Sequence, residues 1–375
     1  MTRAGLFAGL LAVWAALFAF KNDATAQSGP LTRIRLPPGF HIELYARVPR
    51  ARTMVVMEDW GVILVGSRGP TIHAVIDDDR DGKADAVGVL FDNLKLANGI
   101  AWKDKWFYVA EQHRLSRYWA PDLKALAKAK PEVLFDEFPD SSWHGWRYAR
   151  FGPDGHLYVA VGAPCNICAV DGIKGTVVRF TRFPGPPEIF ATGVRNSVGL
   201  DFQPATGDLY FTDNGGDNMG DDSPPDELNH APGKGLWFGY PWYGGGDHRS
   251  PQFKGRALPR TPVFPAVSFG AHVAALGISF YTGDQFPAAY KGDAFVAQHG
   301  SWNRSVPDGY RLMRIRFDKQ THKAVGKEIF ATGWLDADGD AWGRPVDVKQ
   351  LRDGSLLVSD DRAGAIYRIT YKAPQ

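Results

Sequence analysis

A short strand signature recurs along this chain, and it limits the folds that the chain can adopt. In the clearest copies, a turn containing Asp-Gly or Thr-Gly leads directly into an alternating apolar strand. These copies span residues 152–159, 204–211 and 352–358, and weaker copies end in 62–65, 106–109 and 293–296. A spacing of about 45 to 85 residues between short strands is typical of a β-propeller. We therefore expect an all-β, six-bladed β-propeller over residues 27–375.

The first 26 residues predict a signal peptide rather than part of the fold. Arg3 precedes an apolar run over 6–20, and Ala24-Thr25-Ala26 matches a small-residue cleavage site. The alternative is an uncleaved anchor, although the run is short for a full membrane span. We expect a periplasmic or secreted protein whose mature chain has no membrane span. A net charge of +2 gives no indication of nucleic-acid binding.

The chain has two cysteines, Cys165 and Cys168, in the sequence Cys-Asn-Ile-Cys. In an exported protein, a pair this close is typical of a disulfide that stiffens one loop. A redox-active pair and a zinc site are alternatives, but a second ligand pair for zinc is not evident. A c-type haem would need His at the position of Ala169.

Several basic or His-bearing segments precede or follow the strand signatures, where a propeller brings its loops to one mouth. His144 offers an imidazole that accepts protons near neutral pH, although it could instead bond to a neighbouring blade. Arg195 and Asn196 offer a guanidinium fork and an amide suited to a carboxylate or quinone oxygen, with an inter-blade salt bridge as the alternative. Arg304 and Arg344 add cations to the same mouth. Together these residues predict an anionic ligand.

Two segments are rich in oxygen donors. Residues 212–217, followed by acidic residues up to 229, combine a Gly-rich turn with carboxylates and suit Ca²⁺. The alternative is a solvated acidic loop. Asp77, Asp79 and Asp81 match the front half of a calcium loop, but Gly88 stands where an EF-hand has Glu. This second segment predicts either a structural Ca²⁺ or a plain acidic turn.

Together, these motifs resemble those of the soluble PQQ-dependent sugar dehydrogenases, a six-bladed propeller family. The resemblance covers about residues 36–371. It is carried by His144 before the Gly-Pro-Asp-Gly turn, by Gly-x-Arg-Asn-x-x-Gly-Leu at 193–200, by 204–213 and 226–229, and by Arg-Pro-Val-Asp at 344–347. The segments 161–168 and 299–304 make the sorbosone dehydrogenase-like branch the most similar.

The resemblance implies a role for each matched residue. His144 would be the general base, and Arg195 and Asn196 would contact the quinone oxygens of PQQ. The remaining implied contacts are the carbonyls of Gly215 and Gly216 to Ca²⁺, Arg304 and Arg344 to the PQQ carboxylates, and Asn98 at the mouth. The glucose-oxidising members carry an Asp that orients the His, and Gly162-Ala163 stands in its place here. The His therefore needs another partner.

The expected function is that of a PQQ- and calcium-dependent oxidoreductase acting on an aldose or a sugar aldehyde such as sorbosone. Electrons would pass to an external acceptor, a cytochrome or a quinone. One alternative is a calcium-dependent lactonase-type hydrolase, but that chemistry does not need an Arg-rich mouth. The other is a non-catalytic carbohydrate-binding propeller, which the loss of the His-orienting Asp favours.

Overall fold

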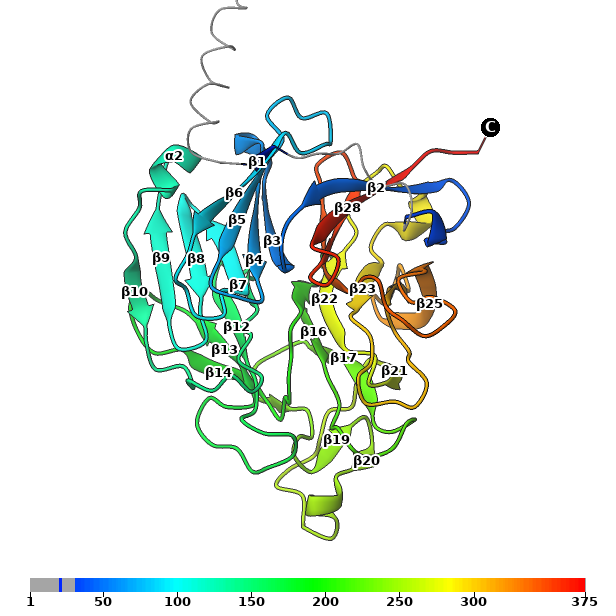
Figure 1. The fold of residues 1–375 in the computed structure, drawn as a ribbon. Helices are drawn as coiled ribbons and strands as arrows, with labels where there is room; N and C mark the ends of the chain where they lie inside the picture. Colours follow the sequence, from blue (N-terminus) through cyan, green and yellow to red (C-terminus); the bar gives the residue numbers. More distant parts are fainter. Residues whose placement is uncertain (1–19, 22–30, 375) are drawn as a thin grey trace, which may run out of the picture.

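The computed structural model describes residues 20–21 and 31–374, and it forms a ring of six antiparallel sheets around one axis (Figure 1). Blade 1 contains β3 (Ala51–Met57), β4 (Val62–Ser67), β5 (Ile72–Ile76) and β6 (Ala86–Phe91). Blade 2 contains β7 (Gly99–Lys103), β8 (Trp106–Ala110), β9 (Leu115–Trp119) and β10 (Glu132–Phe135). Blade 3 contains β11 (Ala149–Phe151), β12 (Leu157–Val161), β13 (Thr176–Phe180) and β14 (Glu188–Thr192).

The chain continues round the ring through three more blades. Blade 4 contains β15 (Leu200–Phe202), β16 (Leu209–Asp213), β17 (Pro225–Ala231) and β21 (Val267–Ala271). Blade 5 contains β22 (Ala275–Phe280), β23 (Ala294–Gln298), β24 (Arg311–Phe317) and β25 (Ala324–Thr332). Blade 6 contains β26 (Pro345–Gln350), β27 (Leu356–Asp360), β28 (Ala365–Tyr371) and β2 (Phe40–Arg47). The predicted six-bladed propeller is confirmed.

Short elements decorate the blades. The remaining strands are β1 (Phe20–Lys21), which pairs with β6, β18 (Leu236–Trp237) beside β14, and the hairpin β19 (Tyr243–Gly245) and β20 (His248–Arg249). The helical turns are α2 (Leu123–Leu126), η1 (Leu31–Arg33), η2 (Glu58–Trp60), η3 (Pro251–Phe253) and η4 (Ala288–Tyr290). Apart from residues 20 and 21, the predicted signal peptide lies outside the described residues. No described helix is both long and apolar enough to span a membrane.

The recurring signature marks the second strand of every blade: β4, β8, β12, β16, β23 and β27. With one exception, the half-buried Trp106 of β8, every residue of these six strands is buried. A strand packed between two neighbouring blades is covered on both faces, which explains its continuous apolar sequence. In five blades a left-handed glycine precedes this strand, because the tight turn from the first strand needs a positive φ; these glycines are Gly61, Gly155, Gly207, Gly292 and Gly354.

The ring is closed by strands from the two ends of the propeller. β2 pairs antiparallel with β28, from Phe40 opposite Tyr371 to Arg47 opposite Ala365. In Figure 1 the blue β2 accordingly lies beside the red β28. The innermost strands β3, β7, β11, β15, β22 and β26 contact one another around the axis. The loops that enter these strands, and the loops that leave the second strands, therefore meet at the same end of the axis.

Candidate functional site

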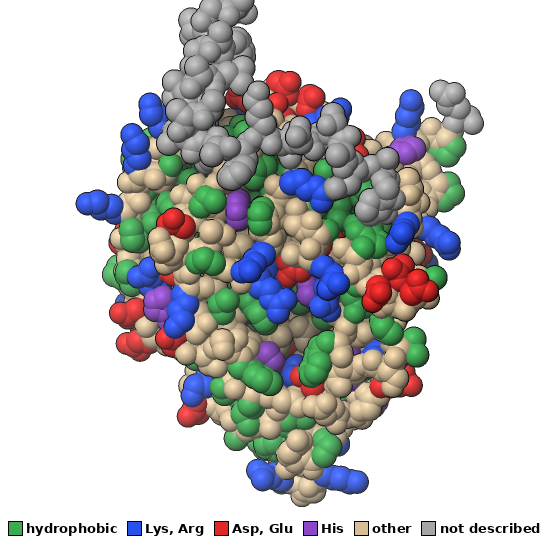
Figure 2. Space-filling view, in the orientation of Figure 1, with side chains coloured by type: hydrophobic (Ala, Val, Ile, Leu, Met, Phe, Trp, Pro, Cys, Tyr) green, Lys and Arg blue, Asp and Glu red, His purple; other side chains and the backbone are tan. Residues whose placement is uncertain are grey.

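A cavity of about 440 Å³ opens at this end of the axis. Its lining comes from several of the segments named in the sequence analysis, and it includes His144, Arg195, Asn196, Gly215 and Arg344. Figure 2 shows Lys, Arg and His side chains gathered around the middle of the face that Figure 1 presents. The structure thus brings together five of the residues that sequence reasoning selected.

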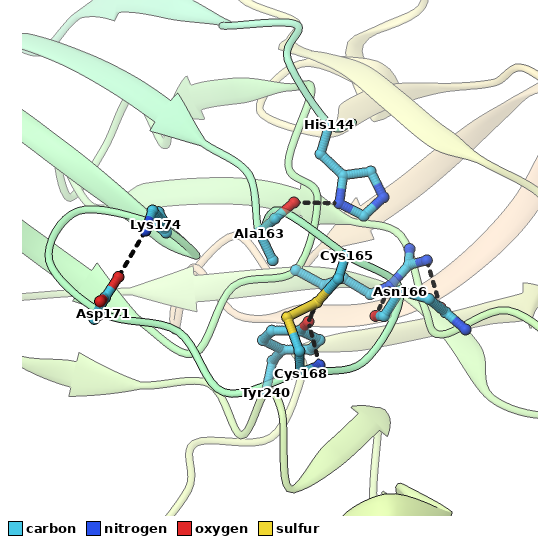
Figure 3. The surroundings of a disulfide bond; sticks show 9 residues. His144, Ala163, Cys165, Asn166, Cys168, Asp171, Lys174 and Tyr240 are labelled. Atoms are coloured by element: carbon cyan, nitrogen blue, oxygen red, sulfur yellow. Dashed lines mark hydrogen bonds and ion pairs between the residues drawn. A yellow bond between two sulfur atoms is a disulfide. The ribbon is translucent and has the colours of Figure 1, made fainter. Parts of the chain in front are cut away.

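His144 lies in the loop that enters blade 3, and its neutral tautomer is set by a backbone carbonyl. Its Nδ1 donates a hydrogen bond of 2.9 Å to the carbonyl oxygen of Ala163, which follows β12 (Figure 3). A neutral imidazole carries one proton, so Nε2 keeps a free lone pair. Burial, reinforced by the positive charge of Arg195, lowers the pKa of His144 to about 3. The imidazole is therefore neutral at neutral pH.

The surroundings of His144 explain why an Asp is missing after β12. An ideal Cβ at Gly162 would lie only 2.5 Å from the Cβ of His144, so this position has no room for a side chain. The carbonyl of Ala163 orients the ring that an acid would otherwise orient. His144 itself has a left-handed backbone, with a φ of 51°, which is uncommon outside functional sites and turns. Arg147 donates 3.1 Å to the His144 carbonyl and so holds this conformation.

Arg195 and Asn196 lie in the loop that leads into blade 4, and they differ in how many of their side-chain polar atoms form hydrogen bonds within the protein. The guanidinium of Arg195 donates to the backbone oxygen and the side-chain oxygen of Asn166 and forms an ion pair of 2.7 Å with Asp217. One further donor of Arg195 reaches the carbonyl of Asn214 at 3.1 Å. In contrast, the side-chain oxygen of Asn196 is buried and has no hydrogen-bond partner among the described residues. Asn196 therefore offers a free polar atom in the cavity wall.

The loop that the disulfide closes, residues 165–168, holds the side chain of Arg195. Cys165 and Cys168 form a disulfide, as predicted, and Tyr240 donates its hydroxyl toward Cys165 and accepts from the backbone N–H of Cys168 at 3.2 Å (Figure 3). Asn166, inside this loop, is the residue that accepts two hydrogen bonds from Arg195. The disulfide therefore lies in the loop whose Asn166 holds the guanidinium of Arg195.

The oxygen-rich loop after β16 supplies a second unsatisfied oxygen. The side-chain oxygen of Asn214 is buried without a partner in the described chain, and Asn214 and Gly215 both line the cavity. Gly215 donates 2.7 Å to Asp226, whose pKa is raised to about 6 by burial. Gly216, which the resemblance placed beside it as a metal ligand, donates 2.7 Å to Gly244 and is not among the described residues that line the cavity.

Two lining arginines were missed by sequence reasoning, Arg52 and Arg68. Both guanidinium carbons lie over the ring of Trp146, at 5.5 and 5.2 Å from its centroid. Arg52 is two residues into the first blade and forms an ion pair of 2.8 Å with Asp361. The blade-entry rule that selected Arg195 and Arg344 would also have selected Arg52, because 51–57 is the innermost strand of blade 1. Arg68 leaves the second strand of that blade, where no motif marked it.

Arg344 and Arg68 are the cations of the cavity that lack a carboxylate. Arg344 donates to the carbonyls of His299 and Gly300, and within the part of the chain that the structure describes neither arginine forms an ion pair. His299 also lines the cavity, and its Nε2 bonds Asp361 at 2.7 Å. Burial, only partly offset by Asp361, lowers the pKa of His299 to about 4. The lining thus holds two cations without a carboxylate partner, Arg68 and Arg344, and among its imidazoles those of His144 and His299 are neutral at neutral pH.

Besides Gly216, two further predicted contacts are not among the described residues that line the cavity, Asn98 and Arg304. Asn98 is fully buried behind the wall, where its side-chain oxygen accepts 2.8 Å from Arg52 and its amide donates to Arg147. Asn98 thus positions Arg52 and does not line the cavity. Arg304 is not among the described lining residues either, because its guanidinium binds the carbonyl of Asp221 and the carboxylate of Asp222. The structure does not bring Arg304 together with the other site residues.

The acidic segment of blade 1 lies away from this cavity and differs in one member from the sequence motif. The structure brings the carboxylates of Asp77, Asp79 and Asp85 together, with one oxygen of each within 4.8 Å of the others. Asp81 is not in this group, and its carboxylate accepts from the backbone of Lys83 at 2.8 Å. The loop turns back at Gly82, which has a φ of 85°, and this turn brings Asp85 rather than Asp81 toward Asp77.

Known proteins of similar structure have the same ring. The calcium structure of a Trichoderma reesei carbohydrate-active enzyme of family AA12 matches with a TM-score of 0.78 at 19% identity, over 93% of this chain and 99% of that chain. The holo PQQ domain of pyranose dehydrogenase from Coprinopsis cinerea matches with a TM-score of 0.73 at 18% identity, over 90% of this chain and 97% of that chain. At these identities the likeness shows a common fold.

Comparisons of the amino-acid sequence match a family model and a relative of nearly the same length. A family model described as TrAA12-like matches residues 258–372, which include β21, the whole of blade 5 and three of the four strands of blade 6. An uncharacterized protein of Borreliella burgdorferi is 30% identical over 369 residues, which cover 95% of this chain and 96% of that protein. Since the identity extends over nearly the whole of both chains, this six-bladed propeller belongs to the same protein family as the Borreliella burgdorferi protein.

Proposed function

We propose that this protein is a PQQ- and calcium-dependent sugar dehydrogenase. The observation that carries the proposal is the pair of cavity cations without carboxylates, Arg68 and Arg344, next to His144, a neutral histidine with one nitrogen free. The names of the structural neighbours support it, because they describe a PQQ domain of a pyranose dehydrogenase and a PQQ-bound aldose sugar dehydrogenase. The TrAA12-like match over residues 258–372 agrees with the same class.

The side chains that line the cavity are chemically suited to bind both PQQ and Ca²⁺. PQQ carries three carboxylates, and Arg68 and Arg344 would pair with two of them, since guanidinium groups recognise carboxylates well. Arg52 adds positive charge nearby, although Asp361 already pairs with it. Ca²⁺ prefers oxygen ligands. The buried oxygens of Asn196 and Asn214, which have no partner among the described residues, together with the backbone at Gly215, would supply them.

The chain's own part of the reaction is to take a proton at Nε2 of His144. The carbonyl of Ala163 holds Nδ1–H, so Nε2 faces the reaction as the unprotonated nitrogen. The sugar hydroxyl gives its proton to Nε2, its carbon gives up a hydride with two electrons, and a carbonyl group results. When bound, PQQ supplies the two-electron hydride acceptor and Ca²⁺ supplies the Lewis acid. An external acceptor, a cytochrome or a quinone, then takes the two electrons.

The rim of the cavity is suited to a sugar. Trp143 and Trp302 line the cavity and are 52% and 70% exposed, which is unusual for such large apolar side chains. Their faces would pack against the apolar face of a sugar ring, as aromatic side chains commonly contribute apolar contact area. An aldose or a sugar aldehyde such as sorbosone fits this chemistry. Export of the mature chain after residue 26, to the periplasm or outside the cell, completes the proposal.

Two other functions are less well supported. A lactonase-type hydrolase needs a metal with carboxylate ligands, whereas the cavity lining carries four arginines, two of which form no ion pair with a carboxylate among the described residues. A non-catalytic binding propeller would need no free imidazole nitrogen. The missing His-orienting Asp favoured that alternative, but the carbonyl of Ala163 accepts the hydrogen bond from His144 in its place.

The test is a His144→Gln variant, with His41→Gln as the matched control because His41 is exposed on β2. Dye-linked turnover over a panel of aldoses and sugar aldehydes should fall at least about 100-fold in His144→Gln, the usual contribution of a general base. Its affinity for PQQ should stay within about threefold of the unmodified protein's. Full turnover in His144→Gln would show that this histidine is not the base.

A further inference from the structure

The three carboxylates of blade 1 form a compact anionic cluster far from the cavity. Asp77 directly follows β5, and Asp79 and Asp85 lie in the loop that leads to β6. The cavity lies where second strands end and innermost strands begin, so a loop between the third and fourth strands of a blade opens at the opposite end of the axis. This cluster is therefore separate from the proposed cofactor site.

Asp77 has a buried oxygen that nothing in the described chain satisfies. The residue is 8% exposed, and its Oδ1 is buried without a hydrogen-bond partner among the described residues. Its Oδ2 accepts 3.1 Å from the hydroxyl of Tyr45. A buried carboxylate oxygen without a partner destabilises the folded state, and two further carboxylates within 4.8 Å add repulsion.

The cations of the same loop do not relieve this repulsion. Arg80 points its guanidinium to the carbonyl of Asp59 at 3.2 Å, and neither Arg80 nor Lys83 forms an ion pair with the three carboxylates in the described structure. The carboxylates instead accept hydrogen bonds from the backbone. Asp79 accepts from the N–H of Asp81, and Asp85 accepts from the N–H of Asp78. Each carboxylate nevertheless keeps a second oxygen, and one oxygen from each converges on the same space.

We propose that Asp77, Asp79 and Asp85 bind a divalent cation of the calcium type. The donor set consists of carboxylate oxygens alone, which suits a hard cation, and two exposed members leave room for water ligands. The orphaned oxygen of Asp77 would become a ligand and so acquire the partner that it lacks.

The cation would also lock the closure of the ring. The loop rests on blade 6, where Ala84 donates 3.2 Å to the carbonyl of Tyr45 on β2 and Arg368 on β28 donates 3.2 Å to the carbonyl of Gly82. β2 and β28 are the pair that joins the two ends of the propeller. Since a ligand that binds only the folded state stabilises that state, the cation would stabilise this seam.

The test uses Asp79→Asn/Asp85→Asn, in which the side-chain oxygens can still accept the loop N–H groups. The control is Asp338→Asn, which removes an exposed charge from a similar turn. Protein free of PQQ is titrated with Ca²⁺ by calorimetry, and with Tb³⁺, whose luminescence Tyr45 should sensitise because its hydroxyl contacts Asp77.

The unmodified protein and Asp338→Asn should bind Ca²⁺ with sensitised Tb³⁺ emission, and their melting temperatures should rise by at least about 2 °C. The double variant should lose at least tenfold in affinity, together with the emission. Wild-type affinity in the double variant would mean that the ion binds elsewhere, for instance near Gly215, and would overturn the proposal. An absence of Ca²⁺ binding in the unmodified protein would overturn it as well.

Discussion

Replacing Gly162 with Ala should disable the proposed base without removing it. The added Cβ would lie 2.5 Å from the Cβ of His144 and 2.7 Å from its carbonyl oxygen, whereas ordinary contacts begin at 3.4 Å. The two residues must therefore separate by about 0.9 Å. The hydrogen bond from Nδ1 to Ala163 is 2.9 Å long, so such a shift stretches it beyond 3.5 Å.

The expected cost can be divided between stability and rate. Crowding a packed position costs about 1–3 kcal/mol, and losing the hydrogen bond costs about 1 kcal/mol. The displacement also moves Nε2 by about 1 Å, and a misplacement of that size lowers catalytic rates about 100-fold. We therefore expect kcat to fall about 100-fold in Gly162→Ala, with the folded state less stable by about 2 to 4 kcal/mol.

The assay measures dye-linked turnover of the most active sugar, PQQ affinity and urea unfolding in the same preparations. Gly233→Ala is the control, because a Cβ there meets nothing within 4 Å. PQQ affinity should hold within about threefold in Gly162→Ala, since His144 is not among the proposed carboxylate partners. A variant with unchanged kcat and unchanged stability would refute the seating of His144 against Gly162.

Two further predictions concern buried groups near the cavity. Burial raises the pKa of Asp226 from 3.8 to about 6, so its contribution to stability is complete below pH 3.8 and is lost as the pH rises through 6. In Asp226→Asn, the fall in the free energy of unfolding with rising pH should be smaller by about 3 kcal/mol, as measured by urea unfolding between pH 4 and 7. If the variant showed the same pH dependence as the unmodified protein, the prediction would be contradicted. Asn98→Ala should leave the Nε donor of Arg52 unpaired, destabilise the fold by about 1–3 kcal/mol in urea unfolding and weaken PQQ binding severalfold. Unchanged stability and affinity would show that Asn98 does not hold Arg52.

The propeller could be predicted from the sequence because each second strand is covered on both faces. That burial requires a continuous apolar run such as Val62–Val65, and the preceding turn requires a residue with positive φ such as Gly354. The signature therefore reports tertiary packing and local backbone conformation at once. The ring closure by β2 could not be read in this way, because an outermost strand is only partly buried and carries no signature.

The sequence could predict only those parts of the site in which the residue type of a side chain indicates its role. His144, Arg195 and Arg344 are marked by motifs at blade entries. The partner of His144 is a backbone carbonyl, which no residue type at position 163 reveals. Asp85 replaces Asp81 because the path of the loop, rather than the spacing of a motif, decides which carboxylates meet. Arg304 is held by Asp221 and Asp222, residues more than eighty positions away, and that contact has no sequence signal.

The most direct test of the proposed function is a calorimetric titration of PQQ into the calcium-loaded mature protein. Binding should be tight, close to one PQQ per chain, and dependent on Ca²⁺. It should weaken at least about tenfold in Arg68→Ala/Arg344→Ala, because each lost guanidinium–carboxylate pair removes a charge-assisted contact. Folded protein that does not bind PQQ, or that binds it equally well without these two arginines, would contradict the assignment of this cavity.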